Sequence, residues 1–193
     1  DFSLRYCDAA ANAVRNVTFE LKNGDRIALD GANGCGKTSL VKAILACNKD
    51  GEAVSSDYKT TGILEVPQNL IISYISQDTS HLKGSLRDFA REKRLDYTLL
   101  LALLRQLDFE RVLFDKDMEL YSEGQKKKVL IASSLLTPAH LYIWDEPLNY
   151  IDVYTRMQIE KLLLAFRPTM LFVEHDVRFK ETIATGVLHM ERN

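Results

Sequence analysis

The stretch Gly31-Ala32-Asn33-Gly34-Cys35-Gly36-Lys37-Thr38 lies between the apolar run Ile27-Ala28-Leu29 and the segment Ser39-Leu40-Val41-Lys42-Ala43-Ile44-Leu45. This order is typical of a strand, a glycine-rich loop and a helix. The spacing G-x-x-x-x-G-K-[ST] is that of a phosphate loop, whose glycines let backbone N–H groups point at phosphate oxygens while the helix N-terminus adds its positive end. The stretch therefore predicts binding of a nucleoside triphosphate.

Two side chains of this loop have distinct expected roles. Lys37 is expected to reach the β- and γ-phosphates, and Thr38 to hold Mg²⁺. Cys35 is interpreted as a small side chain tolerated between glycines. The residues of this region that we predict to contact ATP are Gly31, Asn33, Gly34, Gly36, Lys37, Thr38 and Ser39.

Composition narrows the class of protein. With 193 residues, 46% of them apolar and 27% charged, the chain suits a single soluble globular domain. The longest unbroken apolar run, Leu99 to Leu104, is far too short for a membrane span, so no direct membrane insertion is expected. Three cysteines without metal-site spacing favour a reducing, cytoplasmic location. A net charge of −2 argues against a general nucleic-acid surface.

The order of apolar and polar segments predicts strands around a helical insertion. Alternating apolar residues from Phe2 to Leu21 suggest paired strands, and the polar stretch 48–62 suggests a turn-rich edge. A capping-box pattern at Ser85 predicts a helix start within a helical region at about 78–121. Tyr6 has two open interpretations, a strand aromatic in the core or a ring stacked on adenine.

A further helix is expected to begin at Ser122-Glu123-Gly124-Gln125, because Ser122 and Gln125 have capping-box spacing. The triple lysine Lys126-Lys127-Lys128 follows at once. We interpret it as a solvated face rather than a nucleic-acid patch, given the near-neutral net charge.

Two short apolar strands end in polar residues. Leu141 to Asp145 is followed by Glu146, and Met170 to Val173 is followed by Glu174-His175-Asp176. A helix from about Asp152 to Phe166 joins them, which favours a parallel sheet with its ligand at the carboxyl ends of the strands. Singly, these acids and the histidine could be solvent-facing, and Asp152 a helix N-cap.

Taken in order, these motifs closely resemble the ATP-binding cassette (ABC) family from about Tyr6 to His175. The resemblance implies an α/β fold, with an ABC-type P-loop NTPase core, a mostly parallel sheet, an N-terminal antiparallel β region and a small helical subdomain. We expect a single nucleotide-binding domain over residues 1–193. Its ATP-binding core would span about 1–77 and 137–193, and its helical subdomain about 78–136.

The same resemblance implies the chemistry of an Mg²⁺-dependent ATPase. Asp145 would support Mg²⁺, and Glu146 would polarise the attacking water. Gln77 would touch both the metal and that water, and His175 would contact the γ-phosphate. Such roles suit phosphoryl transfer, which depends mostly on positioning and charge neutralisation.

Ser122, Gly124 and Gln125 would act on a different nucleotide. In ABC proteins this signature segment closes over ATP held by a second cassette, so one chain carries two half sites. Glu123 stands where a glycine is common. Its charge suits the helix N-terminus but would lie near an anionic γ-phosphate.

The sequence from Asp145 to Asp152 is similar to the Glu-Pro-x-Asn-x-x-Asp pattern of the ABC-F proteins, which are twin-cassette ATPases of the ribosome. Within them it resembles the ribosomal-protection, antibiotic-resistance branch, which would make this chain the second, C-terminal cassette. The alternatives are an ATPase subunit of a membrane transporter and a cassette that binds ATP only as structural glue. Intact Lys37, Asp145, Glu146 and His175 argue against the last.

Overall fold

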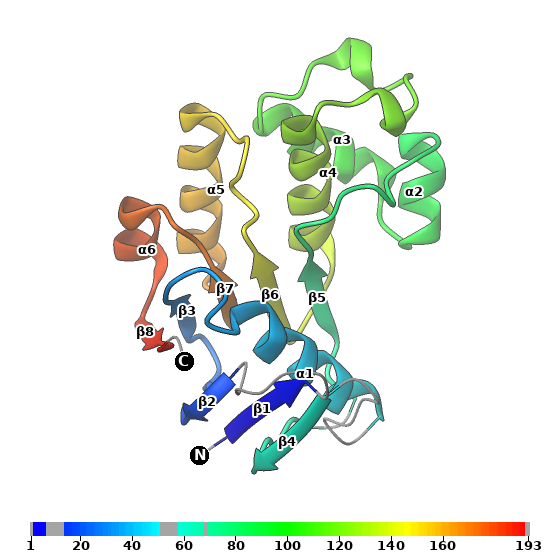
Figure 1. Ribbon diagram of the computed structural model, residues 1–193. Helices are drawn as coiled ribbons and strands as arrows, with labels where there is room; N and C mark the ends of the chain where they lie inside the picture. Colours follow the sequence, from blue (N-terminus) through cyan, green and yellow to red (C-terminus); the bar gives the residue numbers. More distant parts are fainter. Residues whose placement is uncertain (1, 7–13, 51–57, 68, 192–193) are drawn as a thin grey trace.

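The computed structural model describes residues 2–6, 14–50, 58–67 and 69–191, which form two sheets and the helices that cover them (Figure 1). The smaller sheet has the order β2-β1-β4, built from β1 (Phe2–Tyr6), β2 (Val14–Val17) and β4 (Tyr58–Gly62). Both of its pairings are antiparallel. The predicted strand pairing at the N-terminal end is confirmed.

The larger sheet is entirely parallel, in the order β5-β6-β7-β3-β8. Its strands are β3 (Arg26–Asp30), β5 (Ile72–Ile75), β6 (Leu141–Asp145), β7 (Met170–Val173) and β8 (Gly186–His189). Strand β7 is buried along its whole length, as a central strand covered on both faces must be. This sheet and the antiparallel one confirm the predicted α/β fold class.

Five of the α-helices begin where the sequence supplies a side-chain cap. Ser85, Asp96, Ser122, Asp152 and Asp176 each accept a backbone N–H at a helix start. At Ser122 the capping box is complete, since the Gln125 side chain also accepts from the Ser122 N–H. The helices are α1 (Lys37–Asp50), α2 (Leu86–Glu92), α3 (Tyr97–Gln106), α4 (Glu123–Leu136), α5 (Val153–Phe166) and α6 (Val177–Ile183), with single 3₁₀ turns at η1 (Arg111–Leu113) and η2 (Met118–Leu120).

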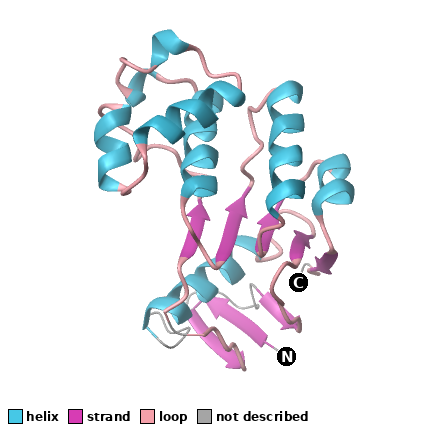
Figure 2. Ribbon diagram, turned by 180° about the vertical axis from the view of Figure 1, so that it is seen from behind, coloured by secondary structure: helices cyan, strands magenta, loops and turns pink. Residues whose placement is uncertain are grey.

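Two hydrophobic clusters cover the two faces of the parallel sheet. One contains Leu40 and Val41 of α1, Leu4 of β1 and one face of the parallel sheet, including Leu171. The other contains the opposite face, including Phe172, with apolar residues of α2 to α6. Figure 2 shows α4 and α5 standing side by side, with the shorter helices α2 and α3 grouped beyond α4. The division into an ATP-binding core and a helical subdomain stays a prediction.

The segment predicted as a turn-rich edge contains regular structure at both ends. Helix α1 continues to Asp50, and β4 occupies residues 58–62. The backbone of β4 pairs with every residue of β1, from Phe2 opposite Gly62 to Tyr6 opposite Tyr58. The sequence did not predict this strand because its threonines at residues 60 and 61 are polar and give no alternating apolar pattern. Threonine is β-branched, however, and suits a half-exposed edge strand.

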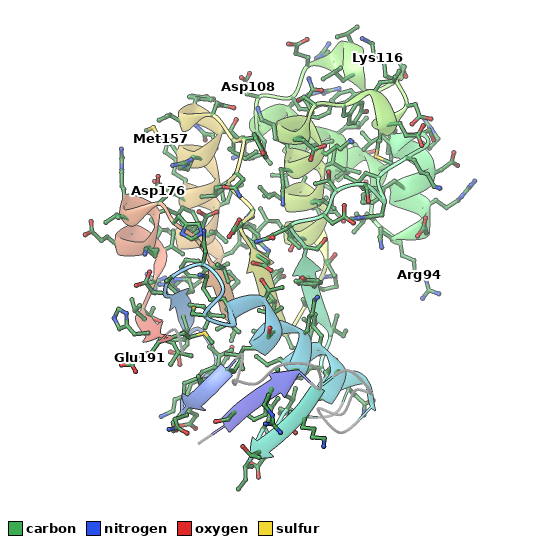
Figure 3. All side chains as sticks on the ribbon, viewed as in Figure 1. Arg94, Asp108, Lys116, Met157, Asp176 and Glu191 are labelled. Atoms are coloured by element: carbon green, nitrogen blue, oxygen red, sulfur yellow. The ribbon has the colours of Figure 1, made fainter. Side chains whose placement is uncertain are left out.

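The interpretation of Lys126-Lys127-Lys128 as a solvated face is wrong. The exposed fractions of Lys127 and Lys128 are only 3% and 8%. Lys128 Nζ donates to the carbonyl of Asp108, a residue labelled in Figure 3, and lies 3.0 Å from the Asp152 carboxylate. Buried lysines need such partners, and these lie about 20 residues or more away in the chain, where local composition gives no sign of them.

Candidate functional site

The carboxyl ends of four neighbouring parallel strands bring the predicted site residues to one edge of the sheet. The phosphate loop follows β3, Gln77 follows β5, Asp145 ends β6 and His175 follows β7. A cavity of about 570 Å³ opens at this edge. It is lined by Asn33, Gly34, Gly36, Lys37, Thr38, Ser39, Gln77 and Glu146.

A larger hollow, of about 1090 Å³, lies elsewhere and is lined by residues from the segments 17–23, 63–67 and 166–171, together with Leu70. Apolar side chains such as Phe19, Ile63 and Phe166 dominate its lining, and no predicted site residue contributes to it. A nucleotide carries several negative charges, which need backbone N–H groups and a cation. The smaller cavity at the phosphate loop is therefore the candidate site.

The phosphate loop depends on its glycines. Gly34 and Gly36 have φ values of +80° and +98°, which residues with a Cβ rarely adopt. A Cβ at Gly31 would lie 2.4 Å from the carbonyl oxygen of Met190 and 2.8 Å from Cys35 Sγ. The loop thus folds around the buried Lys37 side chain, whose Nζ donates to the carbonyls of Gly31 and Ala32 at 2.7 and 3.1 Å.

Thr38 and Asp145 form a pair suited to a hard cation. Thr38 Oγ1 donates to Asp145 Oδ2 at 3.0 Å, while the buried Asp145 Oδ1 has no partner among the described residues. Burial raises the pKa of Asp145, and the hydrogen bond from Thr38 opposes this. Within the described residues no cluster of His, Cys, Asp and Glu could hold a metal alone. One free carboxylate oxygen beside a hydroxyl fits Mg²⁺, which keeps waters and substrate phosphates as its other ligands.

The Glu146 carboxylate is held at the rim of the cavity by contacts on both oxygens. His175 Nε2 lies 3.1 Å from Oε1, and Asn149 Nδ2 donates to Oε2 at 2.9 Å. Glu146 also has φ +50°, in the left-handed region that costs a non-glycine residue of order 1–2 kcal/mol. Its N–H is anchored by the Val173 carbonyl. Asn149, the asparagine of the Glu-Pro-x-Asn-x-x-Asp pattern, therefore helps to hold the Glu146 carboxylate.

Glu174 is a buried carboxylate that the sequence did not single out. Its Oε1 accepts from the Leu148 N–H at 2.8 Å and its Oε2 from the His175 N–H at 3.1 Å. Burial raises the pKa of Glu174, while these backbone N–H groups lower it. Glu174 therefore joins the loop after Glu146 to the loop that carries His175. A charged residue directly after a fully apolar strand was the available signal.

The signature residues lie away from the cavity of their own chain. Ser122, Gly124 and Gln125 are absent from its lining, and Ser122 and Gln125 are engaged in the capping box. A Cβ on Gly124 would come within 2.5 Å of the Tyr150 carbonyl oxygen, so α4 packs closely on the loop after β6. Glu123 accepts from Thr79 Oγ1 at 2.6 Å, which lowers its pKa.

The structure thus brings together most of the predicted phosphate, metal and water-binding residues. Asp145 and His175 join the cavity-lining set through their contacts with Thr38 and Glu146. The side chain of Tyr6 lies outside the described part, so adenine stacking stays a prediction. The roles of the individual site residues also remain predictions.

Comparisons with known proteins agree with this arrangement. A family model described as "ABC transporter" matches residues 14–149. The "ATP-binding protein Uup" of Buchnera aphidicola is 30% identical over 190 residues, which cover 93% of this chain and 30% of that protein. The "ABC transporter F family member 5" of Arabidopsis thaliana is 25% identical over 184 residues, which cover 92% of this chain and 25% of that protein.

Solved structures share the fold. Archaeal ribosome recycling factor aABCE1, solved in complex with a ribosomal stalk protein, superposes with a TM-score of 0.65 at 26% identity. That match covers 88% of this chain and 32% of the other. A dimeric bacterial ABC transporter cassette gives a TM-score of 0.70 at 18% identity, covering 99% of this chain and 94% of that one.

The chain spans about 30% of the length of the first relatives it matches. In the part of the chain that the structure describes, no helix has both the length and the apolar character to cross a bilayer.

Proposed function

The chain belongs to the ABC transporter family as an ATP-binding ATPase cassette of the ABC-F type, and from this premise we propose that it hydrolyses Mg-ATP within a longer protein acting on the ribosome. One observation carries the hydrolytic part. The Glu146 carboxylate, held by His175 and Asn149, lies at the rim of a cavity whose other wall is the phosphate loop.

The residues of this site divide the work of phosphoryl transfer. Loop N–H groups and Lys37 bind the phosphates. Gln77 lines the same cavity and would touch both Mg²⁺ and the attacking water. Thr38 and Asp145 would hold Mg²⁺, which when bound neutralises charge between phosphate oxygens. Glu146 orients the attacking water and accepts its proton. His175 contacts the γ-phosphate from the loop after β7.

A second cassette is the proposed partner for the signature segment. Ser122 and Gly124 lie outside the cavity of their own chain, so they are available to a nucleotide held by another cassette. The N-terminus of α4 offers a positive end for that γ-phosphate. Exposed Tyr150, Val153 and Tyr154 follow Glu146 and add apolar surface suited to a protein partner. The partner would be a sister cassette of the full-length protein or a second copy.

Two observations support the ribosomal role. The sequence of residues 145–152 resembles the pattern of the ABC-F proteins of the ribosome, and the fold is shared with archaeal ribosome recycling factor aABCE1. We further propose that the biological outcome is ribosomal protection against antibiotics, because the sequence Leu148-Asn149-Tyr150-Ile151 resembles that branch of the family. This assignment includes a cytoplasmic location. The competing assignment is the ATPase subunit of a membrane transporter.

Co-sedimentation separates the two assignments. The full-length Glu146→Gln variant, with the sister cassette's corresponding acid also changed, would accumulate in the ATP-loaded closed state, since hydrolysis no longer empties it. We expect this protein to pellet with ribosomes in ATP and to leave them in ADP, with wild-type protein as the control. If the variant stays in the soluble fraction when ribosomes are present but is retained by membranes, the transporter assignment replaces the ribosomal one.

A further inference from the structure

Helix α4 reaches the loop that carries Gln77 through a buried lysine. Lys127 Nζ donates to the carbonyl oxygens of Ser76 and Gln77 at 3.0 and 3.2 Å. No carboxylate of the described residues pairs with Lys127, although Lys126 and Lys128 each have one. Burial lowers the pKa of Lys127, while the negative charges of Asp145, Glu123, Glu146 and Glu174 oppose this. A buried ammonium group needs such compensation, so hydrophobic packing alone does not explain a lysine here.

A second contact joins the same helix to the same loop. Glu123, the first residue of α4, accepts from Thr79 Oγ1 at 2.6 Å, and Thr79 is buried. Lys126 Nζ lies 3.3 Å from the other Glu123 oxygen and holds that carboxylate in place. The first turn and a half of α4 therefore holds residues 76–79 at both ends.

The two connected segments face different nucleotides in the proposed assembly. Gln77 lines the cavity of its own chain. Ser122 and Gly124, at the start of α4, would face the nucleotide of a second cassette. A connection between them can pass information from one half site to the other, because a rigid link forces both ends to move together.

We propose that Lys127 is a positioning residue for Gln77, and that Lys127 and Glu123 make residues 76–79 and the start of α4 move as one unit. Both contacts of Lys127 are to main-chain oxygens, so the Gln77 side chain stays free to reach into the cavity while its backbone is fixed. The direction of signalling rests on the proposed function, but the mechanical connection does not.

Hydrogen exchange of the full-length protein tests the connection without relying on activity. Lys127→Met keeps the length of the side chain and removes its donors, whereas Lys127→Arg keeps donors. We expect Lys127→Met to speed exchange in residues 76–82 by about 2- to 10-fold, the ratio that one lost hydrogen bond gives, with residues 37–45 unchanged. Lys127→Arg should restore part of the protection. Lys161→Met, which removes an exposed lysine of α5, is the control.

Nucleotide dependence tests the coupling itself. In wild-type protein, replacing ATP with ADP should change hydrogen exchange in both residues 76–82 and residues 122–128. In Lys127→Met the change should be confined to residues 76–82. Thr79→Val removes the contact with Glu123 without removing a charge, and should give a smaller effect of the same kind. Unaltered exchange in residues 76–82 of both variants would overturn the proposal.

A double-mutant cycle tests whether Lys127 acts through Gln77. Lys127→Met should lower kcat on the order of 10- to 100-fold with little change in KM, the size expected when a group is displaced by about 1 Å. In a Gln77→Ala background the same change should cost almost nothing more. An equal loss in both backgrounds would show a general structural role and overturn the positioning role. Absence of ATPase activity in wild-type protein would instead refute the proposed function, and the exchange data would still decide the connection.

Discussion

Glu174→Gln removes a charge from a site where two backbone donors converge. The Leu148 and His175 N–H groups donate to separate oxygens of the Glu174 carboxylate, whose residue is only 5% exposed. Glutamine has nearly the same shape but one oxygen and one NH₂ group. Whichever way the amide turns, either the buried Leu148 N–H or the partly buried His175 N–H faces another donor and loses its acceptor.

The expected loss of stability follows from this mismatch. A buried donor left without a partner costs about 1–3 kcal/mol. Neutralising the buried carboxylate recovers part of this, because burial already raises the pKa of Glu174. We therefore expect a net loss of about 1–2 kcal/mol, which for a domain of this size lowers Tm by about 2–8 °C. ATP hydrolysis should fall as well, since both donors lie within two residues of Glu146 or His175.

Thermal unfolding at pH 7, followed by circular dichroism, measures the stability change. Glu181→Gln provides the control, because Glu181 is exposed on α6 and its substitution should leave Tm within about 1 °C. Steady-state hydrolysis on the same preparations gives the second readout. A Glu174→Gln protein that matches the control in both Tm and kcat would refute the role of Glu174 in joining the two loops.

Three further substitutions test other parts of the account. Lys37→Ala should weaken Mg-ATP binding by about 10- to 100-fold through loss of charged hydrogen bonds, and equal affinities by calorimetry would contradict this. Gly124→Ala should lower Tm because the new Cβ would meet the Tyr150 carbonyl at 2.5 Å; a higher Tm, as helix propensity alone predicts, would show that this close approach is absent. Burial alone would raise the pKa of Asp152, but hydrogen bonds from Thr155 and Lys128 outweigh this effect and lower the pKa to about 2. Its stabilising effect should therefore be complete above pH 4 and disappear as pH falls toward 2, so urea unfolding of Asp152→Asn should show less acid destabilisation than wild type.

Local patterns predicted the elements that a few neighbouring residues determine. The phosphate loop requires glycines at positive φ before a helix, and the spacing from Gly31 to Thr38 records this directly. The capping box at Ser122 and the cap at Asp152 are also local, since each joins residues three apart. The carboxyl-edge position of Asp145 and His175 followed from the parallel order of apolar strands.

Contacts between distant segments were not predictable in this way. Lys127 is 50 residues or more from the carbonyls that accept its hydrogen bonds, so its burial depends on how α4 packs beside β5. Glu174 likewise looks like one of several strand-end acids until Leu148 is placed beside it. Strand β4 was hidden because its stability comes from pairing with β1 rather than from apolar side chains of its own.

Glu146→Gln separates ATP hydrolysis from ATP binding when both are measured on one preparation of the full-length protein. Glutamine can keep contacts with His175 and Asn149, which lie 3.1 and 2.9 Å from the two carboxylate oxygens, but it cannot accept the proton of the attacking water. We expect the kcat contributed by this site to fall by about 10²- to 10⁴-fold, while the Kd for Mg-ATP changes by less than about threefold. Undiminished hydrolysis, or loss of ATP binding together with hydrolysis in a folded protein, would contradict the role of Glu146 in orienting the attacking water.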